Sequence, residues 1–410
     1  MQTALVATVL SIASLFVGLT LLIVLGKAWR EVRDGSRHAR RRVLEPRILK
    51  YAHGGAASVL SALGGAIAAR DRVVVGAILL DHVSRVRGVE HDRLCLALDE
   101  LGFVDRFLAG LHGSRWWRRA EAAENLGLAG AKRATAQLAA ALSDEIPEVR
   151  LRAAKALGLV GGRAAVLPLV NALTEPSRWS TMRIADILTG MGSEVVKELI
   201  DAFPNLNAHA KLAALDIVGR IHALPAVPWL LLRLEDSEGN VRARAAHALG
   251  AIGVVDAAPV LRKALGDPDW PVRAMAAKAL GRIHDPEAIP ALCAALRDRE
   301  WWVRANAAEA LKFAGPMGVE ALEKMLLDAD LYARHQACLM LEDAGILDRR
   351  VAQLAASGVV RSAAQSIVSR FVHAGHVSRL HELAATHTQA IVRETLAHLL
   401  SEETTAEVAR

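Results

Sequence analysis

The sequence predicts an all-α protein, an α-solenoid of about ten helical hairpins preceded by one transmembrane helix. Helix-forming alanine and leucine are abundant, whereas aromatic residues make up only 4% of the 410 residues. A motif recurs with a period of 31 residues through much of the chain. A long apolar run without a charged side chain lies near the N-terminus.

The apolar run, residues 4–26, predicts a membrane anchor. As a helix it would measure roughly 34 Å, enough to cross a hydrocarbon core of about 30 Å. No basic residue precedes it, whereas Lys27 and Arg30 follow directly. This order favours a stop-transfer anchor with the N-terminus outside and the rest in the cytoplasm. A cleaved signal peptide and a buried helix of a soluble protein are the alternatives.

The segment 27–50 carries nine Lys or Arg against three acids, which equals the whole formal net charge of +6. Such a segment next to the inner leaflet is expected to contact anionic lipid, and a partner-specific basic helix is the alternative. Trp29 suits the membrane interface. The residues predicted to lie at the membrane surface are Lys27, Arg30, Arg33, Arg40, Arg41 and Arg42. The neutral balance after residue 50 argues against a nucleic-acid-binding solenoid.

The repeated motif is a helix of the form VRxxAAxALG. Clear copies are indexed by Arg119, Arg150, Arg242, Arg273 and Arg304, and weaker ones by Arg183, Lys211, Arg334, Arg361 and Arg393. A proline column predicts the first turn of a second type of helix, at Pro168, Pro228, Pro259 and Pro290. A glycine column predicts helix C-caps, at Gly158, Gly219, Gly250 and Gly281. Each unit is therefore a helix, a tight turn and a helix that must stack on its neighbours.

The VRxxAAxALG helix and the preceding D-x-x-x-x-V-R turn resemble HEAT repeats, in particular the short bacterial kind also found in bilin lyases. The resemblance covers residues 116–345 well and 346–410 loosely. It implies a surface for partners and does not by itself imply a reaction. The predicted domains are an anchor at 1–26, a basic segment at 27–50, degenerate N-terminal cap repeats at 51–115, the solenoid at 116–345 and divergent C-terminal repeats or a cap at 346–410.

An aspartate precedes several indexed arginines by six residues. The pairs are Asp144 and Arg150, Asp236 and Arg242, Asp267 and Arg273, Asp298 and Arg304, and Asp328 and Arg334. In HEAT-like families such residues form a ladder between repeats, so the resemblance implies a structural role, with the aspartate capping a helix and the arginine bridging to a neighbouring aspartate. The copies without this aspartate predict an interrupted ladder, and a change of curvature or a looser segment near residues 175–211.

Two sets of side chains are candidates for partner binding. The first is a tryptophan column two or three residues before an indexed arginine, at Trp116, Trp117, Trp270, Trp301 and Trp302, with Trp179 one place further. These rings either pack over the adjacent turn or form an aromatic ridge, and Trp beside Arg is typical of binding hot spots. The second is a polar row on the helices of the inner face, at Glu121, Glu124, Arg152, Lys155, Asp216, Arg244, His247, Lys278, Asn306 and Glu309. Its mixed signs suit a protein or peptide, or a solvated face.

The sequence gives no sign of catalytic chemistry. Cys95, Cys293 and Cys338 are far apart, and the histidines near His373 and His376 have no acidic or cysteine cluster beside them. We therefore expect no enzyme activity, no cofactor and no metal. The predicted function is a scaffold at the inner membrane of a bacterium that binds a membrane-associated protein. A bilin-lyase-like enzyme or subunit and a nucleic-acid-binding HEAT protein are the alternatives, and the sequence does not indicate an oligomeric state.

Overall fold

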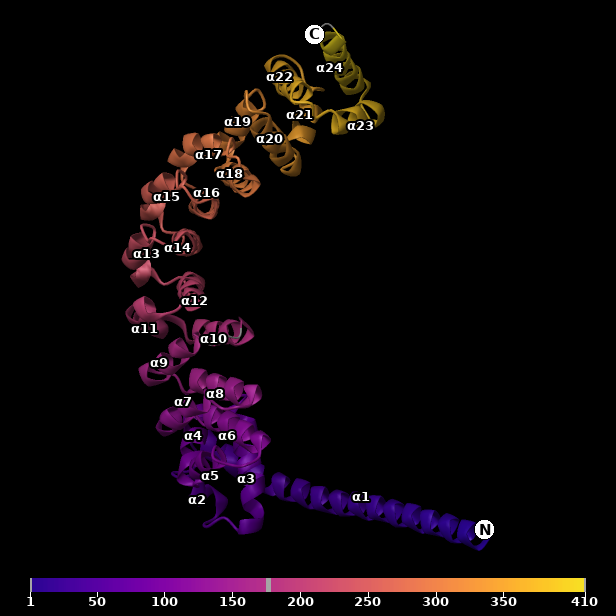
Figure 1. Cartoon of the computed structure of the whole chain (residues 1–410), viewed down its shortest axis with the longest axis vertical. Coiled ribbons are helices and arrows are strands. Elements are labelled where there is room, and N and C mark those ends of the chain that lie inside the picture. The colour runs from indigo at the N-terminus through magenta and orange to yellow at the C-terminus, as the bar shows by residue number, and fades with distance from the viewer. Residues whose placement is uncertain (1, 175–177, 409–410) are drawn as a thin grey trace. The chain divides into compact units, whose positions relative to one another are not determined.

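The computed structural model describes residues 2–174 and 178–408, and their side chains except those of residues 2–15, 17, 28, 30–33, 178–180 and 402–408. Within these residues all regular secondary structure is helical (Figure 1). The predicted all-α class is confirmed. The chain divides into two compact units, residues 1–169 and 170–410, which are described separately below as unit 1 and unit 2.

Unit 1 begins with a single long helix, α1 (Gln2–Ala52), whose C-terminal part packs against the next three helices. Ile48, Tyr51 and Ala52 are buried there. The remaining helices are α2 (Val59–Leu63), α3 (Ala69–Val83), α4 (Val89–Glu100), α5 (Phe103–Gly110), α6 (Trp116–Leu128), α7 (Thr135–Ala141) and α8 (Pro147–Val160), and α9 (Arg163–Ala172) crosses the division between the units. The basic segment 27–50 thus belongs to the same helix as the predicted anchor, and its C-terminal part packs against the rest of unit 1.

The predicted membrane anchor, residues 4–26, forms the N-terminal part of α1, and many of its side chains lie outside the described set. Those that are described, such as Phe16 and Leu22, are exposed. In the part of the chain that the structure describes, no helix has both the length and the apolar character needed to cross a membrane.

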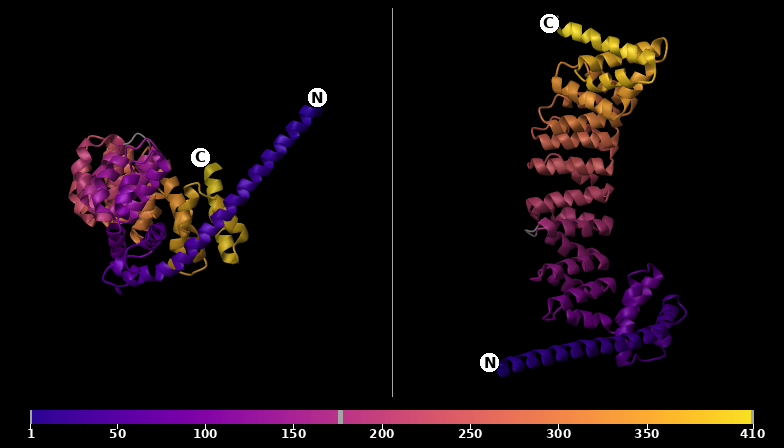
Figure 2. Two further views of the ribbon diagram at one scale, coloured as in Figure 1. Left: turned by 90° about the horizontal axis from the view of Figure 1, so that it is seen from below. Right: turned by 90° about the vertical axis from the view of Figure 1, so that its right-hand side faces the viewer.

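Unit 2 is a stack of helical hairpins, seen as successive layers in Figure 2. The longer helices α12, α14, α16 and α18 each pack on the next one along the chain. The helices are α10 (Arg178–Met191), α11 (Val196–Ala202), α12 (Ala208–Arg220), α13 (Val227–Arg233), α14 (Gly239–Ile252), α15 (Ala258–Ala264), α16 (Trp270–Ile283), α17 (Ile289–Ala295), α18 (Trp301–Phe313), α19 (Pro316–Met325), α20 (Leu331–Asp343), α21 (Ile346–Gln353), α22 (Val359–His373), α23 (Ser378–Thr386) and α24 (Ala390–Val408). This is the solenoid arrangement that the repeat predicts.

Three of the four prolines in the column stand at the start of a helix. Pro228, Pro259 and Pro290 stand in the first two positions of α13, α15 and α17, where a missing N–H removes no helical hydrogen bond. Pro168 differs, because α9 begins at Arg163 and so carries this proline in its interior. The prediction is confirmed for these three prolines and wrong for Pro168.

The glycine column does not cap helices, and that prediction is wrong. Gly219, Gly250 and Gly281 lie inside α12, α14 and α16, just as Gly158 lies inside α8. A Cβ at Gly250 would come within 2.5 Å of the Cα of Ala279 on the next long helix. Gly281 faces Ala310 in the same way, at 2.8 Å. These glycines therefore let neighbouring repeats approach closely.

Two of these helices end at a left-handed residue further along the chain. Gly253 ends α14 with φ of 78°, and His284 ends α16 with φ of 59°. Glycine adopts this conformation without steric cost, whereas histidine does so less readily. The two consecutive repeats thus end in the same backbone geometry with different residue types.

Candidate interaction surfaces

The indexed arginine of a repeat closes the turn that precedes its own helix. Nη1 of Arg273 donates to the carbonyl oxygens of Asp267, at 2.9 Å, and Pro268, at 3.1 Å. The same bonds to the residues six and five positions earlier are made by Arg119, Arg150, Arg242, Arg304, Arg334 and Arg393. The residues predicted to pair within one repeat therefore meet through the backbone carbonyl of the aspartate.

The aspartate side chain instead binds the arginine of the preceding repeat. Nε and Nη2 of Arg273 donate to Asp298 at 2.6 and 2.9 Å, forming a two-pronged ion pair. Equivalent pairs join Arg242 to Asp267 in unit 2 and Arg119 to Asp144 in unit 1. Each such pair is called a rung here, and it spans 25 residues.

The aspartate of a rung is held charged by its surroundings. Asp298 also accepts a hydrogen bond at 2.9 Å from the amide of Glu300, which itself holds the N-cap position of α18, so the predicted capping of this helix by the aspartate is not observed. Burial alone would raise its pKa, but the hydrogen bonds from Arg273 and Glu300 keep the pKa below the usual value. For Asp144, the hydrogen bond from Arg119 is the main cause of its lowered pKa.

The rungs change where the repeat is irregular. The step from Arg304 to Arg334 is 30 residues instead of 31. Asp328 pairs with Arg297 here, and the guanidinium of Arg304 lies 4.8 Å from the centre of the Tyr332 ring. At the earlier irregular copy, Lys211 pairs with Glu238 at 2.8 Å. The looser segment predicted near residues 175–211 begins at residues 175–177, which lie outside the described residues.

The predicted tryptophans of unit 2 are exposed at the N-terminal ends of α16 and α18. The exposed fractions are 39% for Trp270, 51% for Trp301 and 57% for Trp302. The rings of Trp301 and Trp302 meet edge to face, with centroids 4.8 Å apart. The alternative to an aromatic ridge was packing of the rings over the adjacent turn. Their exposed fractions show that such packing does not bury them.

The same edge continues at the start of α20 with Leu331 and Tyr332, which are 60% and 62% exposed. Both stand three and two residues before Arg334, in the positions that Trp301 and Trp302 occupy before Arg304. The predicted tryptophan column does not include them, although they have the same offset from the arginine in the sequence. Trp270, Trp301, Trp302, Leu331 and Tyr332 are called the apolar edge below.

In unit 1, Trp116 and Trp117 begin α6 and are also exposed. The guanidinium carbons of Arg115 and Arg118 lie 5.8 and 5.1 Å from the centre of the Trp117 ring. Cation–π contacts of this kind hold the ring in a defined orientation. Trp179, the remaining member of the column, has a side chain outside the described set.

Ion pairs neutralise part of the charge on the polar row. In unit 1, Arg152 pairs with Glu148 at 2.8 Å and also with Glu124, and Lys155 is exposed. In unit 2, Arg244 pairs with Asp216 of the preceding long helix at 3.1 Å. Several members of the row therefore connect adjacent repeats.

A groove of about 620 Å³ lies beside this row in unit 2, lined by residues of α10, α12 and α14. His247 stands in its lining and is half-buried. Burial, together with the positive charges of Arg282, Arg244 and Lys278, lowers the pKa of His247 to about 4. The histidine is therefore neutral at physiological pH.

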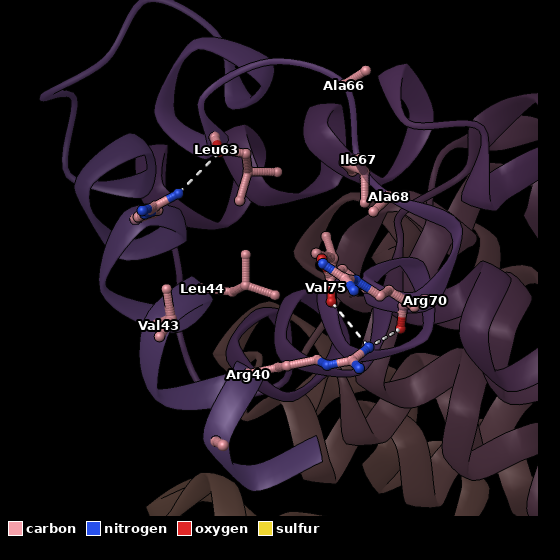
Figure 3. Close-up of a pocket in the computed structure, with 12 residues that line it drawn as sticks. Arg40, Val43, Leu44, Leu63, Ala66, Ile67, Ala68, Arg70 and Val75 are labelled. Atoms are coloured by element: carbon pink, nitrogen blue, oxygen red, sulfur yellow. Dashed lines mark hydrogen bonds and ion pairs between the residues drawn. The ribbon is translucent and has the colours of Figure 1, made fainter. Parts of the chain in front are cut away.

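Two of the residues predicted at the membrane surface are engaged elsewhere. Nη1 of Arg40 donates to the carbonyl of Arg70 at 3.2 Å and to Asp71 at 3.3 Å, beside a pocket of about 410 Å³ (Figure 3). Arg41 pairs with Glu45 at 3.1 Å and with Asp81 at 2.5 Å. These two arginines fasten α1 to α3, a role that differs from the predicted lipid contact. Lys27 and Arg42 are exposed, and the side chains of Arg30 and Arg33 lie outside the described set.

Glu45, Asp81 and His82 form a cluster that could offer three ligand atoms to a metal ion. The guanidinium of Arg41 already contacts both carboxylates, so the positive charge that would balance them comes from the protein's own side chain. The two histidines near the C-terminus have different partners. Nδ1 of His373 donates to the carbonyl oxygen of Ser369, whereas His376 contacts His335 of α20 at 2.8 Å.

The three cysteines are free thiols. Cys338 is buried, whereas Cys95 and Cys293 are partly exposed. Burial raises the pKa of Cys95 to about 11 and that of Cys338 to about 12, which keeps both protonated at neutral pH.

Stacked helical hairpins joined by arginine–aspartate rungs define the class of α-solenoid repeat proteins. The family model for HEAT repeats matches residues 104–188, 193–270, 227–312 and 259–342, and the chain belongs to this family. No curated protein shows a significant match to the sequence. The resemblance drawn from the VRxxAAxALG motif is thus confirmed.

Solved structures resemble the chain at the level of the fold. An engineered protein is 22% identical, with a TM-score of 0.35, over 73% of this chain and 98% of its own. The complex of CpcE and CpcF of phycocyanin lyase from Nostoc sp. PCC7120 is 24% identical, with a TM-score of 0.28, over 58% of this chain and 94% of its own. The karyopherin Kap121p, bound to the extreme C-terminus of the protein phosphatase Cdc14p, is 12% identical, with a TM-score of 0.45, over 90% of this chain and 51% of its own.

Proposed function

We propose that the chain is a scaffold without a reaction of its own, which binds a protein partner along the apolar edge of unit 2. The observation that carries the proposal is the exposure of large apolar side chains at the start of three successive long helices. Single exposed apolar residues are ordinary, whereas a set repeated along one edge is typical of an interaction site.

The chemistry of the edge supports a protein partner. Tryptophan and tyrosine bury large areas and are enriched among binding hot spots, where truncation commonly costs 2 kcal/mol or more. Trp301 and Trp302 support each other edge to face, which limits the side-chain freedom that is lost on binding. The partner is expected to present apolar pockets for these rings.

The double substitution Trp301→Ala and Trp302→Ala is expected to weaken partner binding at least about 30-fold, since two hot-spot rings are lost. The tagged full-length protein is purified in mild detergent from its native membranes, and co-eluting proteins are identified by mass spectrometry. The affinity of the identified partner is then measured for each variant.

The matched control is Leu224→Ala with Leu232→Ala, which removes two exposed apolar side chains of unit 2 that lie off the edge. This control should retain the partner, and both variants should keep the helical circular dichroism spectrum. A partner that binds both variants equally would show that the apolar edge is not the binding surface.

We also propose that residues 4–26 anchor the protein in a bacterial inner membrane, with the N-terminus outside and the chain from Lys27 onward in the cytoplasm. The support is the sequence itself, an uncharged apolar run followed at once by basic residues. Arg42 is exposed, and a basic side chain near the inner leaflet attracts anionic headgroups. Such a tether would raise the effective concentration of the scaffold for a membrane-associated partner.

The full-length chain is expected to remain in the membrane fraction after an alkaline carbonate wash. Two arginines introduced as Leu15→Arg and Phe16→Arg, in the middle of the run, should release it, because each charge at the centre of a span costs about 3 kcal/mol. Leu224→Arg, on an exposed position of unit 2, is the control and should leave the fractionation unchanged. Extraction of the unaltered chain by carbonate would refute the anchor without bearing on the apolar edge.

A further inference from the structure

The pocket of unit 1 drawn in Figure 3 lies between the basic part of α1, the end of α2 and the start of α3. Its volume, about 410 Å³, falls within the range of small-molecule clefts. Leu44 and Leu63 lie on one side of it, and Ile67 and Arg70 on the other (Figure 3). The larger apolar side chains of the lining are Val43, Leu44, Leu63, Ile67 and Val75.

Three arginines and one carboxylate complete the lining. Nη1 of Arg40 donates to the carbonyl oxygen of Arg70 and, at 3.3 Å, to the carboxylate of Asp71. Nη1 of Arg47 donates to the carbonyl oxygen of Leu63 at 3.2 Å. Within the described residues, neither Arg47 nor Arg70 forms an ion pair with a carboxylate. Three guanidinium groups against one carboxylate leave the lining with a surplus of two positive charges.

The combination of apolar walls and surplus positive charge determines the kind of ligand. A guanidinium group binds a carboxylate or a phosphate through parallel N–H donors. An inorganic anion would leave the apolar wall at Leu44 and Leu63 uncovered. A neutral apolar ligand would remove water from Arg70 without supplying a countercharge. An anionic head group joined to a short apolar chain satisfies both parts of the pocket.

The position of the pocket along α1 favours a ligand that is free in solution over a lipid of the bilayer. Arg40 follows Gly26, the last residue of the proposed anchor, by 14 residues of the same helix. That length of helix measures about 21 Å, whereas the headgroup layer on each side of a bilayer is roughly 5–8 Å deep. A tilt of about 40° would still leave Arg40 about 16 Å beyond the end of the span.

We propose that this pocket binds a diffusible anion with a short apolar chain, an alkyl phosphate or an alkyl carboxylate, whose head group contacts Arg70 and whose chain lies against Leu44 and Leu63. The choice of a diffusible ligand rests on the proposed anchor, whereas the charge and the lining of the pocket do not depend on it. The pocket belongs to unit 1 and the apolar edge to unit 2, so that either proposal can fail alone.

The test is isothermal titration calorimetry of the full-length protein with hexyl phosphate and with hexanoate. The protein is held in nanodiscs of zwitterionic phosphatidylcholine, or in buffer if carbonate extracts it, and empty nanodiscs correct for partition into lipid. At least one of the two anions should bind, and about tenfold more tightly than its butyl homologue, which offers two methylene groups fewer to the apolar wall. Inorganic phosphate and hexanol, which each lack one half of the ligand, should bind at least about tenfold more weakly.

Arg70→Gln should weaken binding about tenfold, because the head group loses a charged donor. This variant keeps the backbone carbonyl that Arg40 contacts, so the fold should be unaffected. Arg106→Gln, which changes an exposed arginine of α5 outside the lining, is the matched control and should bind like the unaltered chain.

Three results would overturn the proposal: no binding of either anion, equal binding by Arg70→Gln and the unaltered chain, or hexanol or inorganic phosphate binding as tightly as the anions with a hexyl chain. Native mass spectrometry checks the source of the ligand. A phospholipid that stays bound to the unaltered chain and is lost from Arg70→Gln would overturn the choice of a diffusible ligand.

Discussion

Replacing Arg273 by alanine is expected to lower the free energy of unfolding by about 3 kcal/mol. The residue is 9% exposed, and its side chain makes two hydrogen bonds to Asp298 and two to the backbone carbonyls of Asp267 and Pro268. Alanine would leave the partly buried carboxylate of Asp298 without its countercharge. The measurement is urea unfolding followed by circular dichroism, with hydrogen exchange of α16 and α18 as the local readout.

Arg299→Ala is the matched control. This arginine stands in the turn before α18, its side chain is 78% exposed, and its contact with Glu300 is long, at 3.8 Å. The expected change is within about 0.5 kcal/mol. Similar losses for both variants would mean that the rung does not stabilise the array.

The stabilisation from the rung should also depend on pH. Because the pKa of Asp298 is lower in the folded protein, its contribution is present above the pKa of an unfolded aspartate, about 3.9, and is lost as the pH falls through the folded value. The difference between Arg273→Ala and the unaltered protein should therefore shrink below about pH 4.

Gly250→Ala is expected to destabilise the protein by about 2 kcal/mol, even though alanine is the better helix former by about 1 kcal/mol. The added Cβ would come within 2.5 Å of the Cα of Ala279. Backbone cannot move aside as a flexible side chain can, so α14 and α16 must separate. Thermal and urea unfolding of the variant measure the effect.

Gly190→Ala provides the control for helix propensity. Gly190 lies in α10, and nothing stands within 4 Å of a Cβ built on it. Alanine there should stabilise the protein by up to about 1 kcal/mol. A gain in stability from Gly250→Ala as well would show that the close approach of the two helices is not required.

The sequence carries enough information for the repeat and little for its contacts. The 31-residue period and the proline column reveal where the hairpins lie, because both follow from local helix geometry. Gly250 was misread because spacing alone cannot separate a glycine that ends a helix from one that a neighbouring helix approaches. The structure decides this through Ala279, which lies 29 residues away in the sequence.

For the candidate surfaces, too, local features can be predicted from the sequence, whereas contacts between distant residues cannot. The exposure of Trp301 and Trp302 could be anticipated, since two adjacent tryptophans are hard to bury together. Leu331 and Tyr332 fall outside the prediction because it rested on one residue type instead of on the position before the arginine. Arg41 was assigned to the membrane surface by its place in a basic run, whereas its partner Asp81 becomes apparent only once α3 is folded onto α1.

The rungs also bear on how such an array can lengthen. Each repeat binds its own turn through one arm of its arginine and offers the other arm to the next repeat, whose aspartate lies 25 residues later. A copied block of 31 residues in the stretch from Arg242 to Arg304 would therefore bring one new donor and one new acceptor, and leave neither neighbour unmatched. Gene-level duplication in this register would preserve the rungs, whereas a block that is not a multiple of 31 residues would change the 25-residue spacing of the rung at its junction.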